Sequence, residues 1–255
     1  MIVGLLQLNS PAGDISAGLA AIDGALADAA VAGIDMLVMP ELFLPGYVAC
    51  TTAPDSVRDY LPDVCALVAK HGVALTIGLP ERSDAGLHNN AVSFGRDGAV
   101  LARYSKIQLF GSGEQAVFQP GESYVTFDFE GVRFGLLVCY DIEFQEHARA
   151  LKRRGAEVIL VPTANMLPFV NVHQFSEPAR AAENAVTVVY ANYCGAEGDL
   201  TYTGLSGIIG SDGYSLAKKG QGAVMISAEL PDGGWSEHGV PLSTLIDDLR
   251  WIEDS

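Results

Sequence analysis

Long apolar runs, basic residues and closely spaced cysteines are all scarce in this sequence of 255 residues. Its mean hydropathy is +0.24, yet no stretch reaches the roughly 18 apolar residues that a helix needs to span a bilayer. The first residues form only a short apolar run with no basic segment before it, which is not the pattern of a secretory signal. We therefore expect a cytoplasmic protein with no membrane partner.

The scarcity of basic residues limits the partners that the protein can bind. Fifteen lysines and arginines stand against 31 aspartates and glutamates, which gives a formal net charge of -16. A surface of this sign repels the phosphate backbone of DNA or RNA. We therefore expect no nucleic-acid partner.

The four cysteines are far apart in the sequence, at positions 50, 65, 139 and 194, and no C-x-x-C pair is present. This spacing fits neither a disulfide framework nor a zinc site. The sequence therefore predicts free thiols in a reducing compartment and no bound metal.

The length and the hydrophobic pattern predict one α/β domain over residues 1–255. Strand-like and helix-like patterns alternate from the start of the chain, as is typical of α/β proteins. Strands are expected at 2–8, 35–39 and 73–79, and helices at 16–32 and 62–71.

The rest of the chain mixes hairpins with further crossover units, so we expect one mixed sheet or two sheets. Turn-forming residues at 96–98 and 211–213 predict two hairpins. Further strands are expected at 91–94, 100–104, 158–161 and 186–191, and a helix at 173–184. Residues 242–255 are interpreted as an acidic, partly exposed tail.

The stretch GLLVCYDIEFQE, residues 135–146, places Cys139 where an apolar strand meets an acidic turn. Reactive side chains often lie at the carboxyl ends of strands in α/β folds. A small core residue is the simpler interpretation, because free cysteines are commonly buried. A nucleophilic thiol, whose ordinary pKa is about 8.5, also needs a base or a positive charge nearby.

Two other segments carry the residue types that such a thiol requires. Glu41 follows an apolar strand in VMPELFLPGY, residues 38–47, and Lys106 interrupts an apolar hairpin strand in RYSKIQLFG, residues 103–111. Each residue also has an ordinary interpretation. Glu41 could be a solvated loop acid, and Lys106 could be an outward-facing lysine at a sheet edge.

In this order, the three segments resemble the motifs of the nitrilase superfamily, the carbon-nitrogen hydrolases with a Glu, Lys, Cys triad. The resemblance extends from residue 2 to about residue 229. It also includes LFGSGEQAVFQPG around Glu114, PTANM at 162–166 and ARAAEN at 179–184. The fold that the resemblance implies is a four-layer α-β-β-α sandwich.

The resemblance also implies a role for each residue. Cys139 is expected to be the nucleophile that forms a thioester, Glu41 the general base, and Lys106 the cation that stabilises the oxyanion. The backbone N–H of Tyr140 is expected to be a second oxyanion donor. Glu114 is expected to hold the amide nitrogen or to orient the attacking water.

Among the branches of the superfamily, this short chain is most similar to compact amidases, which use neither a metal nor an organic cofactor. We expect a small linear amide as substrate, because the mostly apolar stretch 162–169 suits a small aliphatic or aromatic acyl group. An anionic substrate end could instead bind to Arg180 or His173. The resemblance also implies a homodimer, or a higher homo-oligomer, paired across a helical face. The expected substrate-binding residues are Tyr47, Phe118, Tyr140, Asn165, Met166 and His173.

Different functions remain compatible with the sequence. Ser105, Gln108 and Gln145 depart from the common motifs, which leaves the triad intact but the substrate preference undecided. A nitrilase or an N-carbamoyl amide hydrolase could use the same triad. The chain could also be a cysteine-histidine hydrolase with His147 as base, a catalytically silent oligomeric binding protein, or a redox sensor that uses Cys139.

Overall fold

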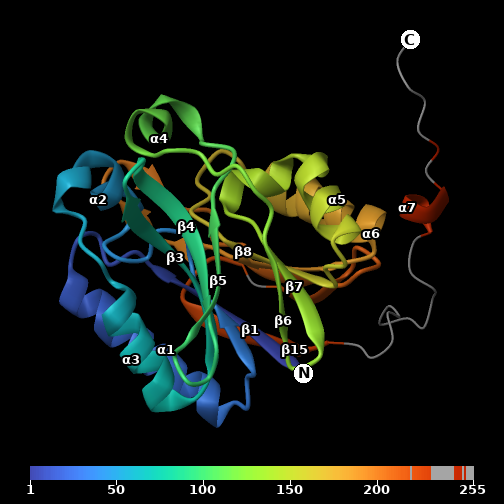
Figure 1. The fold of residues 1–255 in the computed structure, drawn as a ribbon, viewed down its shortest axis with the longest axis horizontal. Helices are drawn as coiled ribbons and strands as arrows, with labels where there is room; N and C mark the ends of the chain where they lie inside the picture. The colour runs from blue at the N-terminus through green and yellow to red at the C-terminus, as the bar shows by residue number, and fades with distance from the viewer. Residues whose placement is uncertain (219, 231–243, 249, 251–255) are drawn as a thin grey trace.

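Two β-sheets lie face to face, and helices cover both outer sides (Figure 1). The computed structural model describes residues 1–218, 220–230, 244–248 and 250. The acidic tail expected at 242–255 therefore lies largely outside the described residues. No helix within these ranges has both the length and the apolar character needed to cross a membrane.

The first sheet contains seven strands in the order β10-β1-β2-β3-β4-β5, with β15 also beside β1. They are β1 (Ile2–Asn9), β2 (Met36–Val38), β3 (Ala74–Ser83), β4 (Gly86–Phe94), β5 (Val100–Ser105), β10 (Tyr193–Cys194) and β15 (Val224–Glu229). The central pairs β1–β2 and β2–β3 are parallel, whereas β3, β4 and β5 form consecutive antiparallel hairpins. The sheet is therefore mixed, with its parallel part next to its hairpins.

The second sheet contains six strands in the order β14-β13-β9-β8-β7-β6. They are β6 (Thr126–Phe129), β7 (Val132–Leu136), β8 (Val158–Pro162), β9 (Thr187–Ala191), β13 (Gly207–Ile209) and β14 (Ser215–Lys218). Its centre, β7–β8–β9, is parallel, and a hairpin flanks it on each side. A separate small hairpin joins β11 (Ala196–Glu197) to β12 (Leu200–Thr201).

Four helices form the outer layers. Helices α1 (Ile15–Val31) and α3 (Leu61–His71) cover the first sheet, and α5 (Gln145–Arg153) and α6 (Glu177–Asn184) cover the second (Figure 1). Asp14 begins α1 by accepting the N–H of Ala17 on its side chain at 2.9 Å, and Gly72 ends α3 in a left-handed conformation. The shorter helical segments are α2 (Tyr47–Thr52), η1 (Pro54–Ser56), α4 (Gly111–Val117), η2 (Cys139–Glu143), η3 (Val172–Ser176) and α7 (Leu245–Asp248).

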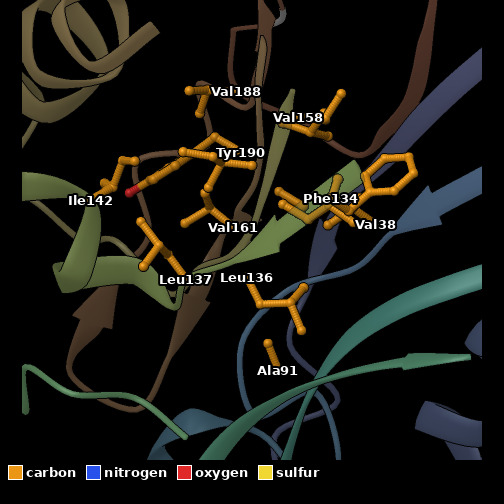
Figure 2. Packing of buried hydrophobic residues seen from close by; sticks show 14 of the residues in the cluster. Val38, Ala91, Phe134, Leu136, Leu137, Ile142, Val158, Val161, Val188 and Tyr190 are labelled. Carbon is orange, nitrogen blue, oxygen red and sulfur yellow. The ribbon is translucent and has the colours of Figure 1, made fainter. Parts of the chain in front are cut away.

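Alternation along the strands divides the core into layers. In β2, Met36 and Val38 belong to the cluster between the sheets, whereas Leu37 belongs to the cluster under α1 and α3. Figure 2 shows Phe134 of β7 beside Val38, and it shows Leu136 of β7 close to Ala91 of β4. Apolar side chains from both sheets thus fill the central layer, and the expected α-β-β-α sandwich is confirmed.

Most expected elements are present with small shifts at their ends, but three differ. The strand expected at 91–94 already begins at Gly86, as β4. The strand expected at 73–79 runs on to Ser83, because β3 continues as a long hairpin with β4. The helix expected at 173–184 is divided into η3 and α6. Pro178 has no N–H to donate, so it is tolerated only in the first turn of an α-helix, where α6 begins.

Candidate active site

Three strand ends bring the predicted catalytic residues together between the two sheets. Glu41 follows β2 after a short segment, Lys106 directly follows β5, and Cys139 lies just beyond β7. β2 and β5 belong to one sheet and β7 to the other, so the sandwich itself juxtaposes segments that are far apart in sequence.

Glu41 is completely buried, and only one of its two carboxylate oxygens has a partner. Oε1 accepts hydrogen bonds from Lys106 Nζ at 2.7 Å and from Asn89 Nδ2 at 2.6 Å. Oε2 is buried without a hydrogen-bond partner. One oxygen therefore fixes the side chain, and the other is free to accept a proton.

The backbone at Glu41 is held as tightly as its side chain. Its N–H donates to the carbonyl of Thr163 at 3.3 Å, and its carbonyl accepts the Tyr193 hydroxyl at 2.9 Å. Gly78 of β3 lies directly against it, and a Cβ at that position would overlap the Glu41 Cα. Only glycine allows this close approach between β3 and the loop after β2.

Lys106 is buried between two carboxylates. Its Nζ donates to Glu41 Oε1 and, at 2.9 Å, to Glu114 Oε1. Burial disfavours the ammonium form, but the negative charges of Glu114 and Glu41 outweigh burial and hold the Lys106 pKa well above its usual range. The interpretation as an exposed edge lysine is therefore wrong, because the side chain is 0% exposed.

Glu114 is the third member of this buried cluster, and α4 carries it. Its Oε1 also accepts the Tyr47 hydroxyl at 2.7 Å, and its Oε2 accepts the backbone N–H of Phe110 at 3.0 Å. Both oxygens are thus fixed, unlike those of Glu41. Tyr47 and Glu114 were both predicted as site residues, and the structure places them in contact.

Cys139 begins the η2 turn with a left-handed backbone, at φ 44°. Residues other than glycine adopt this conformation rarely, and such strained positions cluster at functional sites. Asp141 holds the turn in place. Its buried carboxylate accepts the N–H of Val138 at 3.0 Å, the N–H of Gln108 at 2.8 Å and the Tyr104 hydroxyl at 2.8 Å.

Asp141 therefore fixes the turn of Cys139 to the segment of Lys106, which accounts for the first acid of the CYDIEF stretch. Burial raises the Asp141 pKa to about 6. The hydrogen bonds that the carboxylate accepts, above all the one from Gln108, favour its charged form and limit this rise.

The surroundings of Cys139 favour a neutral thiol at rest. Burial and the Glu41 carboxylate raise the pKa of the thiol well above its usual range, while Lys106 and the backbone N–H of Ala164 act in the opposite direction. A neutral thiol requires a base before it can act as a nucleophile. Glu41, whose charge raises the pKa of the thiol, is also the carboxylate that has an oxygen without a hydrogen-bond partner.

A pocket opens onto Cys139. Four of its ten lining residues are aromatic, and Phe110 is edge-on to both Tyr140 and Phe169 at centroid distances of 5.3 and 5.6 Å. The lining residues are Tyr47, Phe110, Glu114, Cys139, Tyr140, Glu143, Ala164, Asn165, Met166 and Phe169.

Four of the six predicted substrate-binding residues line this pocket, and two do not. Phe118 is buried in the core under α1 and α3 and has no access to the pocket. His173 is also buried, behind the pocket wall, where Nε2 lies 3.0 Å from Asn165 Nδ2 and Nδ1 lies 2.8 Å from Glu177 Oε1. These placements give no support to direct substrate contacts by Phe118 or His173.

The other histidine hypothesis also lacks geometric support. His147 of α5 contacts the Tyr124 hydroxyl through Nδ1 at 2.8 Å and is not part of the pocket lining. Sequence reasoning missed Phe110 and Glu143 as lining residues. Both lie within recognised motifs, since Phe110 belongs to RYSKIQLFG and Glu143 belongs to GLLVCYDIEFQE.

Comparison with known proteins agrees with this geometry. The family model described as carbon-nitrogen hydrolase matches residues 2–237. A protein of Pseudomonas protegens named "Hydrolase in pqqF 5'region" is 40% identical over 203 residues, covering 77% of this chain and 71% of that protein. An (R)-stereoselective amidase of a Pseudomonas species is 35% identical over 235 residues, covering 90% of this chain and 85% of that enzyme.

Solved structures of an amidase from Nesterenkonia sp. AN1 have the same fold. A double mutant of that amidase in complex with acrylamide superposes with a TM-score of 0.90 at 34% identity, covering 98% of this chain and 94% of that one. Another of its structures carries the acetamide moiety of fluoroacetamide on the active-site cysteine, with a TM-score of 0.89, 34% identity and coverage of 98% and 94%. This chain therefore belongs to the carbon-nitrogen hydrolase family.

Proposed function

We propose that this protein hydrolyses a small linear amide to a carboxylic acid and ammonia through a thioester on Cys139. The observation that carries the proposal is the buried cluster of Glu41, Lys106 and Glu114 beside a cysteine, with Glu41 Oε2 unpartnered. This arrangement supplies a base, a fixed positive charge and a nucleophile in one enclosed site.

In the first half of the reaction, Glu41 Oε2 takes the proton of the Cys139 thiol, and the sulfur attacks the amide carbonyl carbon. The carbonyl oxygen becomes an oxyanion, which Lys106 and the backbone N–H of Tyr140 stabilise. Glu41 then gives the proton to the amide nitrogen. The carbon–nitrogen bond breaks, ammonia leaves, and a thioester with Cys139 remains.

In the second half, water replaces ammonia as the reacting molecule. Glu41 takes a proton from the water, the resulting hydroxide attacks the thioester carbon, and the carbon–sulfur bond breaks. The thiolate recovers the proton, and the carboxylic acid leaves. In this proposal Glu114 holds the amide nitrogen and then the water, and its contacts with Lys106, Tyr47 and Phe110, which fix its carboxylate, support this role.

The relatives favour amides over the other substrates of the superfamily. The Nesterenkonia amidase structures contain acrylamide and butyramide. The pocket of this chain, with Tyr47, Phe110, Tyr140 and Phe169 in its lining, suits a small apolar acyl group as well. Nitrile hydrolysis or decarbamoylation on the same residues is the second candidate.

We further propose a cytoplasmic homodimer formed by a single domain over residues 1–255. The resemblance to the family suggests pairing across a helical face of the sandwich. Sedimentation velocity at several protein concentrations tests this proposal, because a species of one chain's mass at all concentrations would contradict it.

Ammonia release from a panel of substrates tests the proposed reaction. The panel contains small aliphatic and aromatic amides, their nitriles, ω-amides of dicarboxylates and N-carbamoyl amino acids. We expect release from neutral amides by the wild type and by Cys65→Ala, whose thiol lies on α3 away from the pocket, but not by Cys139→Ala. Release from nitriles alone, or no release from any compound, would overturn the proposal.

A further inference from the structure

Glu143 is a pocket residue for which the hydrolytic steps above give no role. It ends the η2 turn, is half-buried, and lines the pocket beside Tyr140 and Phe169. Burial raises the pKa of its carboxyl, while the charges of Lys106 and Arg180 act in the opposite direction. The side chain therefore lies within the electrostatic range of Lys106, on the side of the catalytic cluster.

No described residue donates a hydrogen bond to the Glu143 carboxylate or forms an ion pair with it. The nearest candidate, Arg180, has other partners. It donates through Nη2 to the backbone carbonyl of Glu143 at 2.7 Å, through Nε to the carbonyl of Ile142 at 3.1 Å, and through Nη1 to Glu183 Oε1 at 3.0 Å. Arg180 thus fixes the turn and leaves the carboxylate oxygens of Glu143 unpaired.

The pocket has an unbalanced charge. Its lining contains Glu114 and Glu143 but no lysine, arginine or histidine. Lys106 lies behind the lining, where both Glu41 and Glu114 already pair with it. A half-buried, unpaired carboxylate in such a wall disfavours an anionic ligand and favours a cationic one, because a charge-assisted hydrogen bond would satisfy it.

The position of Glu143 relative to Cys139 sets which part of a substrate it can reach. Glu143 lies four residues after Cys139 in the η2 turn, which at a rise of about 2 Å per residue places their Cα atoms roughly 8 Å apart. Because Glu114 is proposed to hold the departing nitrogen, the acyl group is the part of the substrate that is left to extend toward Glu143, which also lines the pocket.

We propose that Glu143 binds a protonated amine on the acyl part of the substrate, so that the preferred substrates are amides of small amino acids. This inference rests on the proposed amidase function of Cys139. Glu143 is then a specificity-determining residue that discriminates between acyl groups by charge.

Two isosteric pairs of amides test the inference: glycinamide against propionamide, and β-alaninamide against butyramide. In the wild type we expect kcat/KM to be about tenfold or more higher for at least one amine-bearing member than for its neutral partner. In Glu143→Gln, which keeps the shape but removes the charge, that ratio should fall at least tenfold. The matched control is Glu146→Gln, an exposed acid three residues further on that should leave the ratio unchanged.

Binding to Cys139→Ala gives a second readout that needs no turnover. Calorimetry with the same four amides should show tighter binding of the amine-bearing member, and the double variant Cys139→Ala, Glu143→Gln should lose that preference. Hydrolysis of propionamide or butyramide without any preference for the amines in rate or in binding would overturn the role of Glu143 and leave the amidase intact. Binding of the amines without hydrolysis of any amide would support Glu143 and overturn the amidase.

Discussion

Two ion pairs of the described residues have nearly the same N–O distance but very different surroundings. In the buried cluster, Lys106 Nζ lies 2.7 Å from Glu41 Oε1, and both side chains are 0% exposed. On the surface, Lys70 Nζ lies 2.6 Å from Asp23 Oδ1, with the two side chains 57% and 38% exposed. From the distances alone, the two ion pairs would be expected to have the same strength.

The surroundings make the difference. Around Asp23, solvent screens the charges, and such exposed pairs contribute little to folding. Around Lys106, three charged groups have been removed from water, which opposes folding unless each is paired. Hydrophobic residues could fill the same space, so a buried charged cluster at this position indicates a functional site. The two pairs thus contrast a solvated surface contact with the buried arrangement that we propose to be catalytic, and variants can test this contrast.

The largest expected effect follows from removing the buried cation. Lys106→Met leaves Glu41 and Glu114 as two neighbouring buried carboxylates without a counter-ion. We expect about 3–5 kcal/mol of lost stability in urea unfolding. Amidase activity should fall at least about 10²-fold, because the oxyanion loses a fixed donor. Lys70→Met is the matched control, and equal unfolding midpoints for the two variants would contradict the comparison.

Removing the base without removing its shape should separate catalysis from folding. Glu41→Gln keeps a carbonyl oxygen for Asn89 and Lys106 but cannot take the thiol proton. We expect kcat/KM for butyramide to fall by roughly 10² to 10⁴. The circular dichroism spectrum should match that of the wild type. Asp23→Asn, the same kind of change in the surface group, should leave the rate within experimental error, and near-normal turnover by Glu41→Gln would rule out its role.

A smaller effect is expected from moving Glu41 without changing it. In Gly78→Ala, the added methyl group would overlap the Glu41 Cα and displace the carboxylate. A displacement of this kind should cost up to about 10²-fold in kcat. The control is Gly24→Ala on α1, where the added Cβ has no atom within 4 Å apart from its chain neighbours and the backbone of its own helix. It should leave the rate intact and stabilise the helix by roughly 0.5–1 kcal/mol.

The pH profile should show the smallest and most specific effect. Burial and the neighbouring Glu114 raise the Glu41 pKa from its ordinary value of 4.5, against the opposing charge of Lys106. Because the base must be deprotonated to act, kcat/KM should fall as the pH falls through this raised pKa. The decline should therefore begin above the pH range of an exposed glutamate. The residual activity of Glu41→Gln should lack this limb, and an identical acid limb in the variant would assign it to another group.

The sequence predicted the elements and the catalytic segments because both depend on local patterns. Alternating apolar residues and turn signals marked β1, α1, α3 and β8, and the motifs around Glu41, Lys106 and Cys139 are contiguous. The juxtaposition of these segments depends on the stacking of two sheets, which the family resemblance implied and no local pattern encodes. The same holds for burial, since Lys106 read alone resembles an exposed edge lysine and is completely buried.

The residues that line the pocket were harder to predict, because the direction of each side chain decides whether it faces the pocket. Phe118 and Phe110 flank the same short helix α4, but Phe118 points into the core and Phe110 into the pocket. His173 lies near the wall in sequence and in space, but it contacts Asn165 from behind. A one-dimensional motif does not distinguish these orientations.

The most direct test of the central claim is mass spectrometry of the enzyme quenched in acid during turnover of butyramide. We expect a butyryl group attached to Cys139 in the wild type, slower accumulation of the adduct in Glu41→Gln, and no adduct in Cys139→Ala. Turnover by Cys139→Ala, or a butyryl group found only on another residue of an active enzyme, would contradict it.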